Sequence, residues 1–306
     1  MTHLTAFRVG EAAPVTTFFA IWMAQDSGFY EKNGLELETV CVSGGKQSGP
    51  DLASGRIHLM HIGMSSVVRA NAAGSNLVTI GSLSNIIRNS LFGAPGVSNA
   101  ADLKGGTIGI SSAGSETDAT TTMALRRLGL TREDVTIKEI GTRRLEEVRT
   151  GFVSASLIGE PFRSQALAMG LPSLLDLYAE KTPWLFSGLV VDRNYLNQHR
   201  DTLLRFMRAT VEGNYQAVAQ AERAKLVLAK ALALTDPDII EKSYANFRDD
   251  TPLDAQISLE GAQNVIDAVA TGAASRTVAD YVDNSIYDQL RLEGFFERMR
   301  EEYQIK

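Results

Sequence analysis

The chain has 306 residues, of which 44% are hydrophobic and 22% charged, and its formal net charge is −6. These values are ordinary for a globular protein with one large or two modest domains. No basic run or basic face offsets the acidic balance, so no nucleic-acid partner is expected. The single cysteine, Cys41, excludes an internal disulfide and a cysteine-based metal cluster, and no metal or cofactor is predicted. No apolar run reaches the roughly 20 residues of a transmembrane helix.

The first part of the chain alternates predicted strands and helices. Hydrophobic patterning predicts strands at residues 5–9, 35–42, 57–62 and 77–83, and helices at 15–27, 47–54 and after Gly63. This alternation indicates βαβ units and a mainly parallel sheet.

The same order returns in the second part of the chain. Strands are predicted at residues 107–111, 135–140, 155–158 and 174–178, and helices at 116–128, 144–150 and after Pro161. Residues 52–57 and 148–153 hold equivalent places, each with a glycine before the third strand, although their sequences are too different to form a repeat. A strand at 188–191 and helices at 200–233, 237–247, 258–271 and 277–281 follow, which suggests that the chain returns to the first block.

Four motifs in this order resemble one family of proteins. They are FAIWMAQDSGFYEKNGL at residues 19–35, SGRIH at 54–58, ADLKGGTIGI at 101–110 and ASLIGEP at 155–161. Together they are similar to the alkanesulfonate-, nitrate- and thiamine-pyrimidine-binding proteins of ABC transporters. The similarity covers about residues 7 to 210, and the rest of the chain more loosely. It departs at His58, where the family usually has an acidic residue.

The resemblance implies an α/β protein with the two-lobed type II periplasmic-binding-protein fold, in which two doubly wound sheets enclose a ligand cleft. Residues 1–85 with 190–306 would form one lobe and residues 86–189 the other. The chain would cross between the lobes near residues 83–92 and 186–191. Ligand would lie at the carboxyl ends of the strands, and the lobes would close on it by a hinge motion.

The turn at residues 111–115 has the best local chemistry for an anion. It follows a predicted strand and opens a helix, so free N–H groups and the helix dipole would favour negative charge. Ser111, Ser112, Gly114 and Ser115 are therefore predicted to contact ligand. The alternative is that Ser112 or Ser115 only caps the helix.

Two turns of the first block are expected to line the same cleft. Gly63, Met64 and Ser65 form the equivalent turn, where glycine allows close backbone approach. The first strand–helix loop offers two hydroxyl donors and an apolar wall in Thr16, Thr17 and Phe18.

Other candidates lie near the predicted crossings. Glu160 could accept a hydrogen bond from ligand or favour its own helix, and Ser187 and Gly188 could serve the hinge and the pocket together. Arg88 could pair with an acidic ligand, and Trp184 could stack on an aromatic one.

The two histidines of the predicted strand at 57–62 are a separate question. His58 and His61 are three positions apart, so on a strand they point to opposite faces and would not share one metal. His61, nearer the carboxyl end, is the better candidate for a pocket residue, although a hydrogen-bonded core histidine is the more ordinary role for either of them.

Two functions follow from these features. The main hypothesis is a monomeric solute-binding protein that captures a small anionic organic ligand (a sulfonate, carboxylate or pyrimidine-like molecule) for an ABC permease. The alternative is an enzyme on the same fold, such as an aromatic acid decarboxylase or a desulfinase-like lyase. The desulfinase type needs a cysteine in the first strand–helix loop, where this chain has residues 14–18 without one. Residues 1–10 lack a signal-like pattern, so a periplasmic location is expected if a signal was removed and a cytoplasmic one otherwise.

Overall fold

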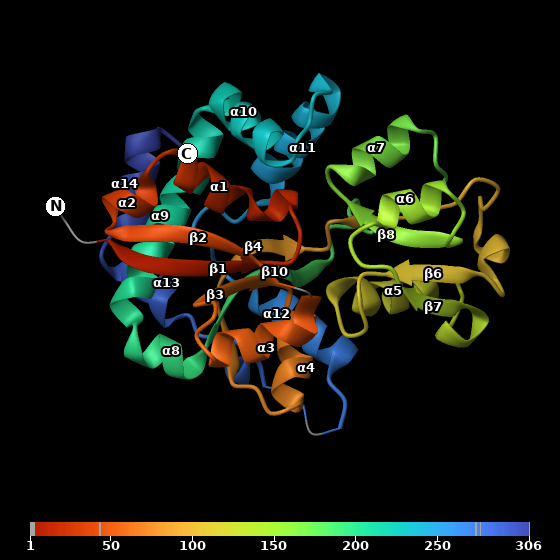
Figure 1. Ribbon diagram of the computed structural model, residues 1–306, viewed down its shortest axis with the longest axis horizontal. Coiled ribbons are helices and arrows are strands. Elements are labelled where there is room, and N and C mark those ends of the chain that lie inside the picture. Colours follow the sequence, from red (N-terminus) through yellow and green to blue (C-terminus); the bar gives the residue numbers. More distant parts are fainter. Residues whose placement is uncertain (1–3, 43, 273, 276, 306) are drawn as a thin grey trace.

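The computed structural model describes residues 4–42, 44–272, 274–275 and 277–305. Two five-stranded sheets form two lobes, which lie side by side in Figure 1. The first sheet has the order β2 (Leu35–Cys41), β1 (Thr5–Glu11), β3 (Leu59–Ile62), β10 (Pro183–Asp192) and β4 (Leu77–Ile86). Strands β2, β1 and β3 run parallel, and β10 is antiparallel to both β3 and β4.

The second sheet repeats this plan. Its order is β7 (Thr136–Glu139), β6 (Thr107–Ile110), β8 (Ala155–Gly159), β5 (Asn89–Gly93) and β9 (Ser173–Leu175). Strand β5 is antiparallel to β8 and β9, as β10 is to its neighbours. The fourth strand of each sheet, β10 or β5, is the first strand that the chain forms after it crosses from the other lobe.

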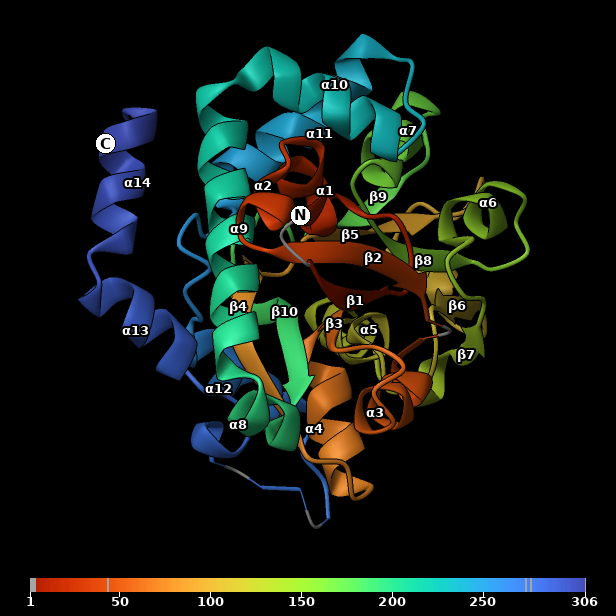
Figure 2. The same ribbon diagram turned by 60° about the vertical axis from the view of Figure 1, so that its left-hand side comes forward.

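Helices cover both sheets, and the first lobe holds most of them (Figures 1 and 2). The first lobe contains η1 (Thr16–Phe18), α1 (Phe19–Asp26), α2 (Phe29–Lys32), α3 (Gly44–Ala53), α4 (Met64–Ala72), α8 (Arg193–Gln198), α9 (Arg200–Ala219), α10 (Ala221–Ala231), α11 (Pro237–Asp250), α12 (Leu259–Val269), η4 (Val278–Asp280), α13 (Ser285–Leu292) and α14 (Phe295–Tyr303). The second lobe contains η2 (Ala100–Leu103), α5 (Glu116–Arg127), η3 (Arg132–Asp134), α6 (Arg144–Arg149) and α7 (Phe162–Ala168).

The strand period of two separates the core into two faces. Leu59 belongs to a buried cluster with residues of α1 and α9, whereas its neighbour Met60 belongs to a second cluster with residues of α4 and α12. The second cluster continues into the other lobe through Ile108 and Leu125. The lobes therefore share apolar core along one side of their junction.

The weak similarity between residues 52–57 and 148–153 corresponds to a repeated backbone geometry. Gly55 donates to the carbonyl of Leu52 at 3.1 Å, and Gly151 donates to that of Val148 at 3.0 Å. Both glycines have a positive φ, +71° and +75°. The two lobes therefore end the helix before their third strand with the same left-handed turn.

The predicted strands of both series are present, but several boundaries were wrong. Residues 89–93 form β5, although the sequence predicted no strand there and placed most of them in the first crossing near 83–92; they complete the middle of the second sheet. The predicted second crossing at 186–191 falls inside β10, which pairs with β4 from Pro183 onward. The chain therefore returns between Leu175 and Pro183.

The helical tail also differs from its prediction. The helix expected at 200–233 divides at Gln220, whose φ of −121° and ψ of 62° leave the helical region. The helix expected at 277–281 is one 3-10 turn, and α13 and α14 were not predicted. Both contact α9 at the surface of the first lobe (Figure 2). No helix among the described residues is long and apolar enough to cross a membrane.

The contact between α1 and α9 depends on one glycine. A Cβ at Gly213 would lie 2.6 Å from the carbonyl oxygen of Ala20 and 2.8 Å from Cβ of Ala24. Alanine in a helix normally stabilises by about 1 kcal/mol relative to glycine, but overpacking costs about 1–3 kcal/mol. We expect Gly213→Ala to lower the free energy of unfolding by up to about 2 kcal/mol in urea denaturation. Gly213→Ser should cost more, and a stabilised Gly213→Ala protein would contradict this close packing.

Candidate functional site

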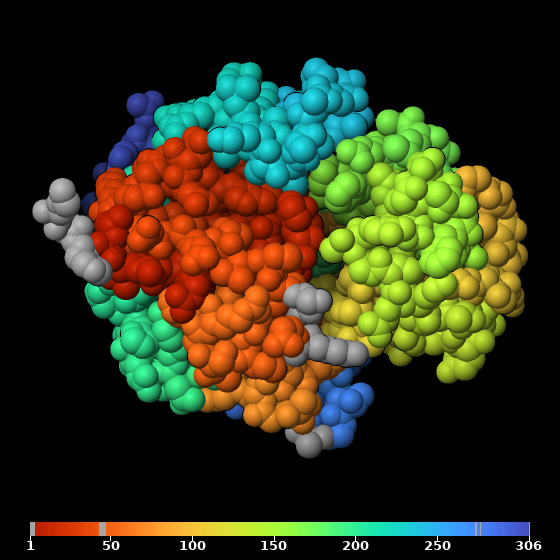
Figure 3. All heavy atoms as spheres, viewed as in Figure 1, coloured from red at the N-terminus to blue at the C-terminus, as the bar shows by residue number. Residues whose placement is uncertain are grey.

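The two lobes meet along a furrow between the red-orange atoms of the first lobe and the yellow-green atoms of the second (Figure 3). The carboxyl ends of β1 and β3 and the N-terminus of α4 belong to the first lobe at this junction. The turn after β6 and the start of α5 belong to the second. Side chains from both lobes meet here.

Glu116, the first residue of α5, makes a close contact across the junction. Its Oε1 accepts a hydrogen bond of 2.6 Å from the backbone N–H of Ser65 in α4. Its Oε2 accepts one of 2.7 Å from the indole N–H of Trp184 in β10. Gly63, which caps α4, leaves the room, because a Cβ there would overlap the Glu116 side chain. A carboxylate of the second lobe thus occupies two N–H donors of the first.

Burial and hydrogen bonding oppose one another at this carboxylate. Loss of solvent raises the pKa of Glu116 to about 7, although the bonds from Trp184 and Ser65 and the charge of Arg69 act to lower it. The Ser65 hydroxyl lies near enough to Glu116 to lower the pKa of that carboxyl. Among the described residues, the buried Ser65 Oγ has no partner that meets hydrogen-bond geometry.

An ion-pair network flanks this contact. Asp118 of α5 pairs with Arg69 of α4 at 3.0 Å, across the junction, and with Arg132 of its own lobe at 2.7 Å. It also accepts a 2.8 Å hydrogen bond from the N–H of Gly114, whose φ is +84°. Burial alone would raise the pKa of Asp118, but these donors hold it below its usual range.

The serine turn forms a closed set of hydroxyl contacts. The Ser111 hydroxyl donates to that of Ser115 at 2.9 Å and lies 2.8 Å from that of Thr117. Ser115 donates to the carbonyl of Ser112 at 2.7 Å and caps α5 by accepting from the N–H of Asp118 at 3.3 Å. The capping role is therefore present, and ligand contact by this turn stays a prediction.

Two buried polar residues of the first lobe, Glu11 and His61, are neighbours on β1 and β3. Glu11, the last residue of β1, is in register with His61 of β3, so both side chains point to the same face. Glu11 is only 8% exposed, and its Oε1 has no hydrogen-bond partner among the described residues. Burial raises the pKa of Glu11 to about 7 and lowers that of His61 to about 4. His61 is therefore neutral at physiological pH.

His61 contacts two predicted site segments. Its Nε2 hydrogen-bonds the hydroxyl of Ser187 in β10, and its pKa reflects a hydrogen bond with the backbone of Thr17. The ring of Phe18 meets the imidazole edge-on at 5.2 Å between centroids. Thr16 is buried in the same 3-10 turn. His61 is thus a buried, hydrogen-bonded histidine. It lies at the lobe junction, where the sequence predicted a pocket residue.

Two predicted site residues have little room for ligand. Gly188 allows β10 to approach its neighbours, since a Cβ there would lie 2.7 Å from Cγ2 of Thr79. Met64 is fully buried in the core cluster that joins the lobes.

Arg88 is held within the protein near the first crossing. Its guanidinium donates to the Ser84 hydroxyl at 2.7 Å, to the carbonyl and side-chain oxygens of Asn246 at 2.7 and 2.8 Å, and to the Thr251 hydroxyl at 3.2 Å. Burial lowers the pKa of Arg88 to about 10, which leaves it cationic. Four of the five donors of a guanidinium are thus engaged, so Arg88 ties β4 to α11.

Glu160 serves its own helix. Its carboxylate accepts from the N–H of Ser164 at 3.2 Å and from the Ser164 hydroxyl at 3.0 Å, and it lies 3.5 Å from Arg163. These contacts occupy both oxygens within α7, which matches the alternative that the sequence left open.

His58 and His61 have separate partners, as their spacing predicts. Nδ1 of His58 accepts from the N–H of Arg8 at 3.1 Å, and its ring stacks on Tyr195. Among the described residues, no group of three or more His, Cys, Asp or Glu side chains is arranged to hold a metal ion.

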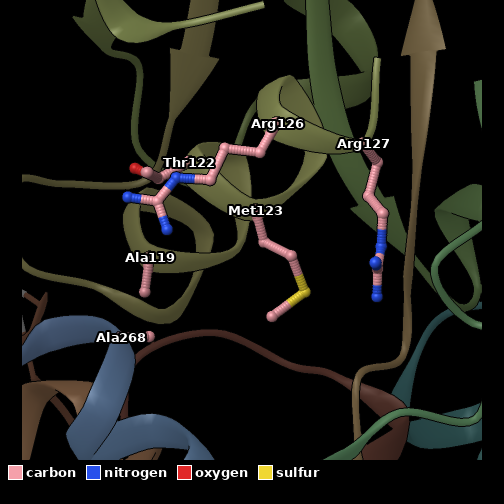
Figure 4. Close-up of a pocket in the computed structure, with 6 residues that line it drawn as sticks. All are labelled: Ala119, Thr122, Met123, Arg126, Arg127 and Ala268. Carbon is pink, nitrogen blue, oxygen red and sulfur yellow. The ribbon is translucent and has the colours of Figure 1, made fainter. Parts of the chain in front are cut away.

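A surface pocket of about 310 Å³ lies between α5 and α12, away from the predicted cleft walls. Figure 4 shows Met123, Arg126 and Arg127 of α5 around it, with Ala268 of α12 at the opposite edge. This pocket contains none of the predicted site residues. Glu11, His61, Glu116 and Asp118, whose pKa values are shifted, lie instead at the lobe junction.

Sequence reasoning missed three acids at this junction, Glu11, Glu116 and Asp118. The sequence marks Glu116 only as the start of a helix and gives Glu11 no distinguishing feature, because a lone glutamate at the end of a strand or helix is commonplace. The one available signal is position: Glu116 follows directly on the turn at 111–115, and Glu11 lies between the first predicted strand and the loop at 16–18. Asp118, in the first turn of the same helix as Glu116, is equally ordinary in sequence.

The fold and the junction define a two-lobed protein of the type II periplasmic-binding-protein class, as the motifs implied. The family model described as NMT1/THI5 like matches residues 15–224. This chain belongs to the NMT1/THI5-like family, and the resemblance drawn from its motifs is confirmed.

Solved structures with the same fold are distant in sequence. A protein from Bordetella bronchiseptica RB50 has a TM-score of 0.80 at 17% identity, with 98% of each chain covered. The periplasmic aliphatic sulphonate binding protein SsuA from Escherichia coli has a TM-score of 0.72 at 22% identity, covering 93% of this chain and 99% of that one. The desulfurization enzyme DSZB has a TM-score of 0.67 at 15% identity, covering 94% and 99%. None of the curated protein sequences matches the chain.

The raised pKa of Glu11 predicts a pH-dependent cost of folding. A group whose pKa is raised from 4.5 to about 7 contributes stability that is full below about pH 4.5 and lost as the pH rises through 7. Glu11→Gln, which cannot ionise, should therefore be more stable than wild type at pH 8 by about 2 kcal/mol and about equal to it at pH 5. Urea denaturation at both pH values measures this difference.

Glu139 is exposed on β7, so Glu139→Gln is the matched control. It should change the free energy of unfolding little at either pH. A Glu11→Gln protein that is destabilised equally at pH 5 and pH 8 would show that the carboxyl has a hydrogen-bonding role that outweighs its charge.

Proposed function

We propose that this protein is a solute-binding protein that captures a small anionic organic ligand by lobe closure and delivers it to an ABC importer. The observation that supports it best is the pair of buried donors at the junction. The N–H of Ser65 and the indole N–H of Trp184 already bind a carboxylate, that of Glu116, at 2.6 and 2.7 Å. An acid group of a ligand has the same acceptor chemistry.

The ligand class follows from these donors and their surroundings. Arg69 of α4 adds one positive charge beside the donors. Because the protein as a whole is acidic, its overall field does not attract an anion, and capture relies on local N–H groups. A sulfonate or carboxylate fits such a site, and the SsuA neighbour is described as a sulphonate binder. The buried Glu11 carboxyl favours a ligand that also carries N–H groups, as an aminopyrimidine does.

Closure would move the two lobes as bodies. We place residues 1–85 and 190–306 in one and most of 86–189 in the other, with the paired ends of β4 and β10 as the hinge. The protein would act as a monomer beside a permease, in the periplasm if a leader is removed. The walls of the site would be Thr16–Phe18, Gly63 with Ser65, and the turn at 111–115.

A second function has one observation in its favour. Glu11, with a pKa near 7, lies beside the neutral His61, which itself bonds to Ser187. A carboxyl group near half-protonation can donate a proton to a carbanion, as the decarboxylation of an aromatic acid requires. The DSZB neighbour shows only that the same fold occurs in an enzyme.

Binding can be tested by thermal shift with ethanesulfonate, nitrate, benzoate and 4-aminopyrimidine. We expect the melting temperature to rise with the concentration of at least one acid, following RT ln(1 + [L]/Kd). Trp184→Phe replaces the indole with a smaller ring that has no N–H donor. In a Glu116→Ala background, where the protein's own carboxylate no longer occupies this donor, Trp184→Phe should weaken that acid about tenfold or more, since one hydrogen bond to a charged group contributes about 1.5–3 kcal/mol.

Trp22→Phe on α1 is the matched control and should leave the affinity unchanged. Equal affinities of Glu116→Ala and of Glu116→Ala with Trp184→Phe for every acid would contradict the donor site. Release of carbon dioxide from an aromatic acid, lost in Glu11→Gln and His61→Ala, would favour the enzyme instead.

A further inference from the structure

Among the described residues, the hydrogen-bond partners of the Glu116 carboxylate all lie on the other lobe. Both oxygens accept from the first lobe, one from Ser65 and one from Trp184. An acidic residue in the first turn of a helix commonly serves that helix through its dipole. Here the side chain turns away across the junction, so stabilising α5 does not explain its contacts.

The first lobe is shaped to receive this side chain. Gly63 has a φ of −78° and a ψ of 154°, an ordinary extended conformation that any residue can adopt. The backbone conformation therefore does not require glycine at this position. A Cβ at Gly63 would overlap the Glu116 side chain, so the glycine serves to admit Glu116.

The donors that hold Glu116 are costly to leave empty. Ser65 and Trp184 are fully buried, and a buried N–H without an acceptor costs about 1–3 kcal/mol. If Glu116 left, an acid group from another molecule would satisfy both donors. A ligand and Glu116 therefore compete for the same two N–H groups.

We propose that Glu116 is an internal competitor of the ligand: its carboxylate holds the lobes together when no ligand is bound, and an acidic ligand must displace it. The displacement by an acidic ligand rests on the proposed function, whereas the holding of the two lobes by Glu116 does not depend on it. Glu116 would thus set the affinity threshold, admitting acids that bind the Ser65–Trp184 pair more strongly than a tethered carboxylate does.

The competition can be measured with spin labels on the whole chain. The single native cysteine, Cys41, is exposed at the end of β2, and Thr136→Cys adds one exposed site on β7 of the other lobe. Double electron–electron resonance then reports the distance between the lobes. Without ligand, we expect one narrow distance in wild type and a longer, broader distribution in Glu116→Ala. Glu139→Ala is the control and should match wild type.

Gly63→Ala tests the same contact from the first lobe. Its Cβ should expel Glu116 and open the lobes as Glu116→Ala does. The double variant Gly63→Ala with Glu116→Ala should be no more open than either single variant, because both remove one contact. Circular dichroism checks that each variant is folded.

The ligand arm uses ethanesulfonate and benzoate. We expect Glu116→Ala to bind at least one of them about tenfold more tightly than wild type. Unchanged distances in both single variants would overturn the closure role of Glu116. Binding to wild type with no gain in Glu116→Ala would overturn the competition and leave the proposed function intact. Failure of every acid to bind either protein would overturn the competition and the proposed ligand class together, while the distances still decide closure.

Discussion

The antiparallel pairing of β4 with β10 is the constraint on which the junction depends. It joins Ile86 to Pro183 in register, so the two chain crossings lie side by side although 97 residues separate them in sequence. The same pairing carries Trp184 to Glu116 and Ser187 to His61. Both polar clusters of the junction therefore exist because one long strand returns from the second lobe into the first sheet.

Charge at the junction is balanced locally. Each acid there differs in how it is satisfied: Asp118 has two arginines, Glu116 has two neutral N–H donors, and Glu11 has an oxygen with no partner among the described residues. The pKa values follow this order, lowered for Asp118 and raised for the other two. Partly satisfied acids at a lobe junction suit a site that exchanges partners when it opens, whereas a static core would pair them.

Much of the fold was predictable from local patterns. Alternating strands and helices, the glycines at 55 and 151 and four ordered motifs led to two α/β blocks and the correct family. The errors fell on β5 and β10, whose places are decided by pairing with strands far away in sequence. Of the candidate site, the turns at 63–65 and 111–115 were found because each follows a strand and opens a helix.

The sequence by itself determined which turns could form at the carboxyl ends of the strands, because capping residues, glycines and strand periods act over a few neighbours. Only the tertiary structure decided which side chains those turns would meet. Arg88, a candidate for ligand, is held by Asn246 and Thr251, and Glu116, an ordinary helix-start residue, reaches Ser65 and Trp184. Partners of this kind depend on how the two lobes are brought together, which no local pattern contains.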